Sequence, residues 1–164
     1  MRYGNITRAV FIDRTNRFIA HVEIDGRENT VHVKNTGRCR ELLIPGAEVW
    51  LAGSDNPARK TAYDLIAVRK PSGLLVNIDS PDAPTQRGTK HLRELAKAEG
   101  YQAVLLFVIQ MDGVTEVRGN RGTDPAFCQT LEEAKEAGVK VIFLPCHVEP
   151  DGLSFAANEK TPRL

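Results

Sequence analysis

A proline-containing stretch, Asp79-Ser80-Pro81-Asp82-Ala83-Pro84, divides the chain into two halves that follow different patterns. Proline has no backbone N–H donor and disfavours helical geometry at the residue before it, so this stretch cannot form an ordinary helix or a central strand. Before it, short apolar runs alternate with turn signals, as in consecutive β-strands. After it, helical patterns alternate with buried-strand patterns. We therefore predict one domain over residues 1–80 and a second over residues 81–164.

The first half is predicted to be a small β-barrel. In one of its runs, Phe18, Ala20, Val22 and Ile24 alternate with polar residues, so they are expected to share one buried face. The segment 35–43 is expected to open into a short helix that stops before Pro45. Several short strands with one intervening helix suit a closed barrel such as the OB-fold. The predicted strands are 5–12, 17–24, 29–34, 47–52, 63–69 and 74–78.

The second half is predicted to be an α/β domain. Residues 87–99 and 125–137 favour helices, and Asp124 and Pro125 supply the cap and first position of the latter. The apolar runs 103–109 and 139–144 are typical of parallel strands that are covered on both faces. The fold class predicted for the whole chain is therefore mixed α/β, with an N-terminal OB-like barrel.

The composition limits the kind of protein. The net charge of the 164-residue chain is only +1, which is far from the balance of a DNA-packaging protein, so a nucleic-acid site must be a local patch. No apolar run is long enough for a signal peptide or a membrane span. The three cysteines are far apart and form no CxxC, which fits a reducing compartment. We expect a cytoplasmic protein with no membrane partner.

Basic residues gather in and beside two loops of the first half. Such side chains, with nearby amides, contact phosphates in nucleic-acid-binding proteins, but the same residues also suit a solvated surface. Two more cations lie on the first turns of the helix after the proline-containing stretch and extend the candidate track. The candidate DNA-binding residues are Lys34, Asn35, Arg38, Arg40, Arg59, Lys60, Arg87 and Lys90.

A second candidate site is built from carboxylates. Asp64, Asp79 and Asp82 are the residues that would gather Mg²⁺, because hard divalent cations prefer carboxylate oxygens. The alternative interpretation is structural: Asp79 and Asp82 stabilise turns or cap a helix. Asp82 and Lys90 are the candidate catalytic residues, although no Glu-x-Lys follows such an Asp at the interval that a nuclease site needs.

Several long motifs together resemble the sugar fermentation stimulation protein A (SfsA) family. They include Asn35-Thr36-Gly37-Arg38, Asn56-Pro57-Ala58-Arg59-Lys60-Thr61 and the segment from Pro81 to Leu92. The resemblance implies an OB-like DNA-binding domain followed by a domain of the PD-(D/E)XK nuclease type. It also implies DNA binding without sequence specificity and a part in regulating sugar (maltose) metabolism.

The chain departs from that family at one place. Family members carry a helix and several strands between the counterparts of Ser80 and Pro81, and this insert holds the acidic residue and the Glu-x-Lys of the nuclease-like site. The resemblance therefore implies a shortened second domain and a DNA-binding protein rather than an enzyme. The alternative is a Mg²⁺-dependent nuclease whose site is rebuilt from other residues. The lost strands would leave an open sheet edge, which predicts packing against the barrel, low stability or a homo-oligomer.

Overall fold

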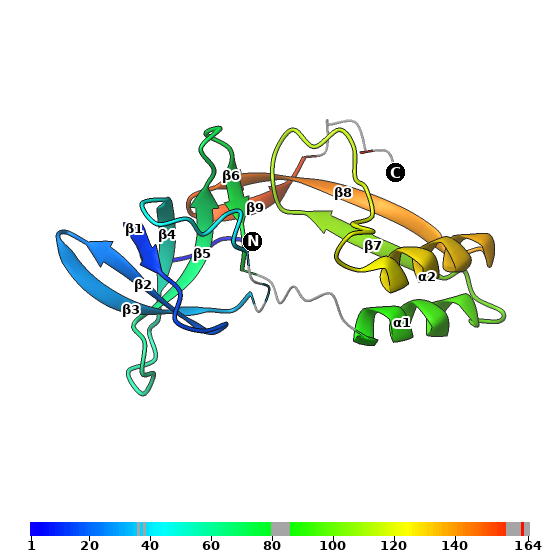
Figure 1. Cartoon of the computed structure of the whole chain (residues 1–164), viewed down its shortest axis with the longest axis horizontal. Helices are drawn as coiled ribbons and strands as arrows, with labels where there is room; N and C mark the ends of the chain where they lie inside the picture. The colour runs from blue at the N-terminus through cyan, green and yellow to red at the C-terminus, as the bar shows by residue number, and fades with distance from the viewer. Residues whose placement is uncertain (36, 38, 80–85, 157–161, 163–164) are drawn as a thin grey trace. The chain divides into compact units, whose positions relative to one another are not determined.

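The computed structural model describes residues 1–35, 37, 39–79, 86–156 and 162 (Figure 1). The chain divides into two compact units. Unit 1 comprises Met1–Ala83, Gln110–Asp112 and Cys146–Phe155, and unit 2 comprises Pro84–Ile109, Gly113–Pro145 and Ala156–Leu164. The predicted domain boundary between Ser80 and Pro81 lies outside the described residues.

Unit 1 contains a closed OB-like barrel, which confirms the predicted fold class. The strand order is β3-β2-β1-β4-β5-β6, and an additional pairing of β3 with β5 closes a barrel of the first five strands (Figure 1). The closing pair is parallel and joins His32 to Asp64 and Val33 to Leu65. The strands are β1 (Ile6–Asp13), β2 (Ile19–Ile24), β3 (Arg27–Val33), β4 (Glu48–Gly53), β5 (Tyr63–Arg69) and β6 (Leu75–Asn77).

The alternation of apolar residues explains the barrel core. Ala20 and Val22 of β2, and Val31 and Val33 of β3, are fully buried and pack in one cluster with Leu51 of β4. Burial of each of these valine and leucine side chains contributes about 1.5–3 kcal/mol relative to exposure. Phe18 is an exception, because β2 begins after it and the ring is 42% exposed. The prediction that Phe18 shares the buried face is therefore wrong.

The short helix expected after residue 35 is also wrong, as far as the described residues show. Residues 40–42 form a turn, and the backbone of Cys39 has a left-handed φ of 45°. The carbonyl of Cys39 accepts hydrogen bonds from Leu42 and Leu43, at 3.0 and 2.8 Å. A left-handed residue at the start and Pro45 shortly after leave room for one turn only.

A C-terminal hairpin also belongs to unit 1. Strand β8 (Lys140–Glu149) enters this unit with its second half and pairs with β9 (Gly152–Phe155) through a turn. Val148 and Leu153 pack against Trp50, Ile66 and Leu75 of the barrel. The predicted strand pair around Asp151 and Gly152 is therefore present, and its apolar side chains extend the core of the barrel.

Unit 2 contains α1 (Gln86–Ala96), β7 (Val104–Ile109), α2 (Pro125–Glu136) and the first half of β8. The Asp124 side chain caps α2 by accepting a 2.9 Å hydrogen bond from the Phe127 N–H, as its sequence position predicts. Strands β7 and β8 are parallel. Leu92 of α1 and Leu131 of α2 pack in one cluster with Leu105 and Phe107 of β7.

Only one face of β7 is covered by apolar neighbours in this cluster. Val104, Leu106 and Val108, which point to the other face, are 43%, 50% and 45% exposed. The expectation that this strand is buried on both faces is wrong, because both helices pack on the same side of it. No helix in the described part of the chain is long and apolar enough to cross a membrane.

Candidate nucleic-acid interface

The strand pair that closes the barrel carries a network of charged side chains. Asp64 is 7% exposed, and its carboxylate accepts hydrogen bonds from the Arg59 guanidinium at 3.0 and 2.5 Å. His32 Nδ1 lies 3.1 Å from the same carboxylate. Lys34 Nζ lies 3.5 Å from Asp64 Oδ2 and 3.0 Å from Asp79 Oδ1, so one ammonium group bridges two carboxylates.

The partners of Asp64 control its ionisation. Burial alone would raise the pKa of this carboxyl, but the hydrogen bonds from Arg59 and His32 and the charge of Lys34 outweigh it and lower the pKa to about 2. Burial would lower the pKa of Lys34, but the hydrogen bond and charge of Asp79 and the charge of Asp64 raise it. Both groups are therefore held in their charged forms.

This ionisation predicts a loss of stability in acid. The folded-state pKa of Asp64 is below its unfolded value of about 4, so the stabilisation is complete above about pH 5 and is lost as the pH falls towards 2. We expect Asp64 to contribute about 2 kcal/mol to the free energy of unfolding at neutral pH. Urea unfolding of the wild type and of Asp64→Asn should give stability curves that converge between pH 5 and about pH 2. Parallel curves would contradict this assignment.

The carboxylates proposed as Mg²⁺ ligands converge on Lys34 instead of leaving an open site. The Lys34 ammonium group lies beside both Asp64 and Asp79. Within the described ranges, no group of three or more His, Cys, Asp or Glu side chains could hold a metal ion. Asp82 lies outside the described residues. The described side chains therefore do not fit a magnesium site, and we derive no chemical step through one.

The candidate DNA-binding residues fall into different settings. Lys60 and Arg40 are exposed, in the β4–β5 loop and in the turn before β4 respectively. Asn35 is buried, and its side-chain oxygen accepts a 2.8 Å hydrogen bond from the Gly37 N–H, so it holds a turn. Arg59 and Lys34 are engaged with the aspartates described above. Arg38 lies outside the described residues.

The two candidates on α1 belong to unit 2. Arg87 and Lys90 are both exposed there. Lys90 Nζ lies 3.8 Å from Glu94 Oε1 one turn later, a surface pair that contributes little to stability. Neither residue has a described neighbour that indicates a catalytic role, so the role of Lys90 as a catalytic residue stays a prediction.

None of the binding residues predicted from the sequence lies in the loop between β1 and β2, residues 14–18. The Arg14 guanidinium donates hydrogen bonds to the backbone carbonyls of Gly37, Asn35 and Arg17, at 2.6, 2.6 and 2.5 Å. These bonds tie the loop to the segment that follows β3. In the sequence Arg14 is one cation in a polar turn, and no local pattern indicates that its partners lie more than twenty residues away.

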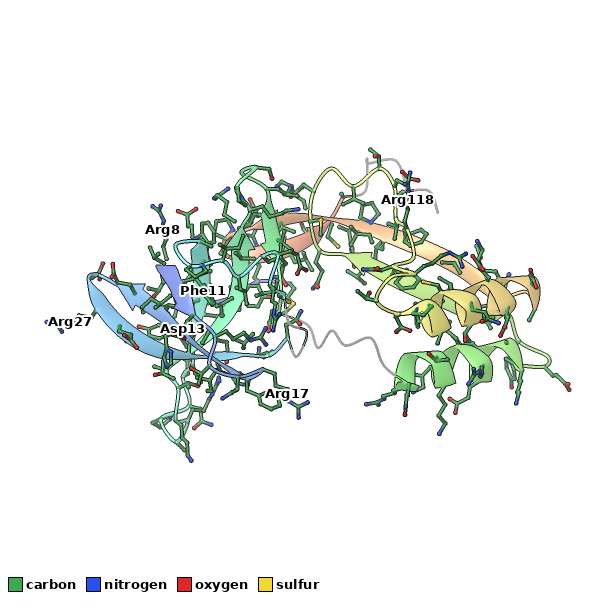
Figure 2. All side chains as sticks on the ribbon, in the orientation of Figure 1. Arg8, Phe11, Asp13, Arg17, Arg27 and Arg118 are labelled. Atoms are coloured by element: carbon green, nitrogen blue, oxygen red, sulfur yellow. The ribbon has the colours of Figure 1, made fainter. Side chains whose placement is uncertain are left out.

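The same loop presents an aromatic ring and a second cation. The Arg17 guanidinium lies over the Phe18 ring, with 4.7 Å between its central carbon and the ring centroid. Such pairing orients both side chains. Figure 2 shows Arg17 extending outward from this loop, whereas Arg27 lies at the tip of the hairpin between β2 and β3. The neighbouring residues Arg17 and Phe18 are the sequence pattern that indicates a binding surface in this loop.

Comparisons with known proteins agree with this architecture. Residues 12–78 match the family described as the SfsA N-terminal OB domain, and residues 78–152 match the sugar fermentation stimulation protein RE domain. A sugar fermentation stimulation protein homolog of Desulfitobacterium hafniense is 38% identical over 216 residues, covering 93% of this chain and 94% of that protein. A homolog of Clostridium beijerinckii is 38% identical over 219 residues, covering 94% and 96%.

A solved structure shares the fold. The structure of Pyrococcus furiosus SfsA in complex with Ca²⁺ matches with a TM-score of 0.83 and 22% identity, over 95% of each chain. The alignment with the Desulfitobacterium protein, over 216 residues, is longer than this chain of 164 residues. The relative therefore contains residues that have no counterpart here, as the predicted shortening requires.

Proposed function

Because this chain belongs to the sugar fermentation stimulation protein family, and its first unit is an OB-like barrel with basic loops, we propose that it binds DNA without sequence specificity. OB-folds bind oligonucleotides with the face of strands 2 and 3 and with the loops between strands 1 and 2 and between strands 4 and 5. In this barrel those loops carry Arg17 and Lys60.

The observation that carries the proposal is the bonding of both loops to the end of β3. Arg14 anchors the β1–β2 loop to the carbonyls of Asn35 and Gly37. Arg59 anchors the β4–β5 loop to Asp64, which Lys34 also contacts. Each of these two loops is therefore bonded, directly or through Asp64, to residues at the end of β3, which supports a preorganised binding surface.

The cations of this surface therefore fall into two groups, one structural and one that contacts DNA. Arg14 is bonded to backbone carbonyls, and Arg59 and Lys34 are paired with carboxylates, so these three residues support the surface. Arg17, Arg40 and Lys60 are exposed and supply the phosphate contacts. Contacts to phosphates carry no sequence information, so they support binding without sequence preference. We further propose that the protein is cytoplasmic and that it regulates sugar (maltose) metabolism by binding DNA.

The test is the triple variant Arg17→Ala/Arg40→Ala/Lys60→Ala. Each lost phosphate contact should reduce the slope of log affinity against log salt by about 0.7 for a single strand and about 0.9 for a duplex, and we expect roughly tenfold weaker binding at low salt. Fluorescence anisotropy with a labelled oligonucleotide at two salt concentrations measures both quantities. Arg27→Ala, at the far end of the β2–β3 hairpin, is the control and should bind like the wild type.

Two results would contradict the proposal. Unchanged affinity and salt slope in the triple variant would remove the barrel loops from the interface. Magnesium-dependent cleavage of the same oligonucleotide, seen on a gel after the titration, would instead favour the nuclease interpretation. We expect intact DNA with and without magnesium.

A further inference from the structure

A cavity of about 480 Å³ lies beside the β1–β2 loop in unit 1. Phe11 of β1, Leu43 and Pro45 are its apolar lining residues. Phe11 and Leu43 belong to the barrel core cluster, so this apolar lining is supported by packed side chains. A rigid apolar wall of this kind suits a flat, apolar ligand group.

Cations surround this apolar lining. Arg14, Arg17 and Arg40 line the cavity, and Asp13 is the one carboxylate among its described lining residues. The Asp13 carboxylate has a partner already, because its Oδ1 lies 2.7 Å from His21 Nδ1. Arg14 is held by three backbone carbonyls, so its position does not depend on a ligand. The cavity therefore combines an apolar surface with an excess of positive charge.

We propose that this cavity takes one unpaired base of a single-stranded nucleic acid, with the adjoining phosphates on Arg17 and Arg40. This inference rests on the proposed DNA binding and names its substrate class. A nucleotide is a planar base with apolar faces and polar edges, joined to an anionic phosphate, and its faces and its charge match the apolar lining and the cations of the cavity. A base inside a duplex is stacked on both faces and paired at its edge, so it cannot enter.

The aromatic ring next to the cavity supports a strand rather than a free nucleotide. Phe18 is exposed, and Arg17, which lines the cavity, lies against its ring. Exposed aromatic rings and arginine planes are the stacking platforms of single-strand-binding OB-folds. One base in the cavity places the next base of the same strand within the reach of this Arg-Phe pair, a contact that a mononucleotide lacks.

The experiment compares three forms of one labelled ligand by fluorescence anisotropy: an oligothymidylate, the duplex of the same length, and the same strand with abasic sites. We expect the strand to bind at least about tenfold more tightly than the duplex, and abasic sites to weaken binding by about tenfold at an unchanged salt slope. Arg17→Ala and Phe18→Ala should reduce the difference between strand and duplex. Arg17→Lys, which keeps the charge but not the plane, should reduce it as well.

The controls separate this inference from the proposed function. Arg27→Ala should keep the preference for the strand, and the exposed positions of Arg17 and Phe18 mean that thermal unfolding should be unchanged in their variants. Equal affinity for strand and duplex, or no effect of abasic sites, would overturn the inference and leave DNA binding intact. Thymidine monophosphate that binds as tightly as the strand would overturn it too. No binding of any DNA would overturn both.

Discussion

Replacing Asp64 with alanine should lower the free energy of unfolding by about 2–3 kcal/mol, because a buried carboxylate loses its charge-assisted hydrogen bonds to partners that are themselves partly exposed. The carboxylate is buried at the closing point of the barrel, where Arg59, His32 and Lys34 all lie against it. Without it, these partly exposed groups lose their common partner. Chemical denaturation monitored through Trp50, which lies in β4, measures the change.

Two further variants separate the ion pairs from a general effect of truncation. Glu28→Ala removes a carboxylate from an exposed position of the same closing strand, β3, and should change stability by less than about 0.5 kcal/mol. The double variant Asp64→Ala/Arg59→Ala should cost less than the sum of the two single variants, because the two side chains contact each other. Additive losses would show that the pair is not a unit.

The substitution Asp64→Ala should also change the affinity for DNA. Arg59 bonds the β4–β5 loop to Asp64 of β5, and Asp64 in turn contacts His32 and Lys34 at the end of β3. If the loops must be held together to bind DNA, then Asp64→Ala should weaken DNA binding even though it removes a negative charge. A purely electrostatic view predicts the opposite, tighter binding.

The barrel could be predicted from the sequence because its signals are local. Alternating apolar residues in 17–24 and 29–34 indicate strands with one buried face, and Asp25 and Gly26, both with positive φ, form the turn between them. The charged network could not be predicted in the same way. It joins residues of β3, β5, the β4–β5 loop and the segments that follow β3 and β6, and the parallel pairing of β3 with β5 brings its centre together.

The second half shows a different limit. The apolar run in β7 and the cap of α2 indicate their elements correctly, but an apolar run does not tell which of its faces other elements cover. No local pattern indicates that Val148, near the end of β8, packs with Trp50 of the barrel. In both cases the local pattern predicts an element, whereas its neighbours are decided by contacts between distant segments.

The uncovered face of β7 leads to a prediction about association. Among the described residues β7 is the edge strand of its sheet, and it exposes Val104, Leu106 and Val108 on one face. Exposed apolar patches mark surfaces that contact another chain. We propose that a second copy of this chain packs its own stripe against this one around a twofold axis, because such a contact places the same apolar residues of both copies on each other.

Leu106→Glu should therefore weaken self-association by at least about 100-fold, because it would bury an unpaired carboxylate in the contact. Sedimentation velocity over a range of concentrations should show the wild type shifting towards a dimer and the variant remaining a monomer. Tyr101→Glu, at a position 86% exposed in the same unit but outside β7, is the matched control and should associate like the wild type. A wild type that stays monomeric, or a Leu106→Glu dimer of unchanged affinity, would show that the stripe is not an interface between copies. The apolar side chains of the stripe would then remain exposed to water, which is unfavourable for the shortened chain.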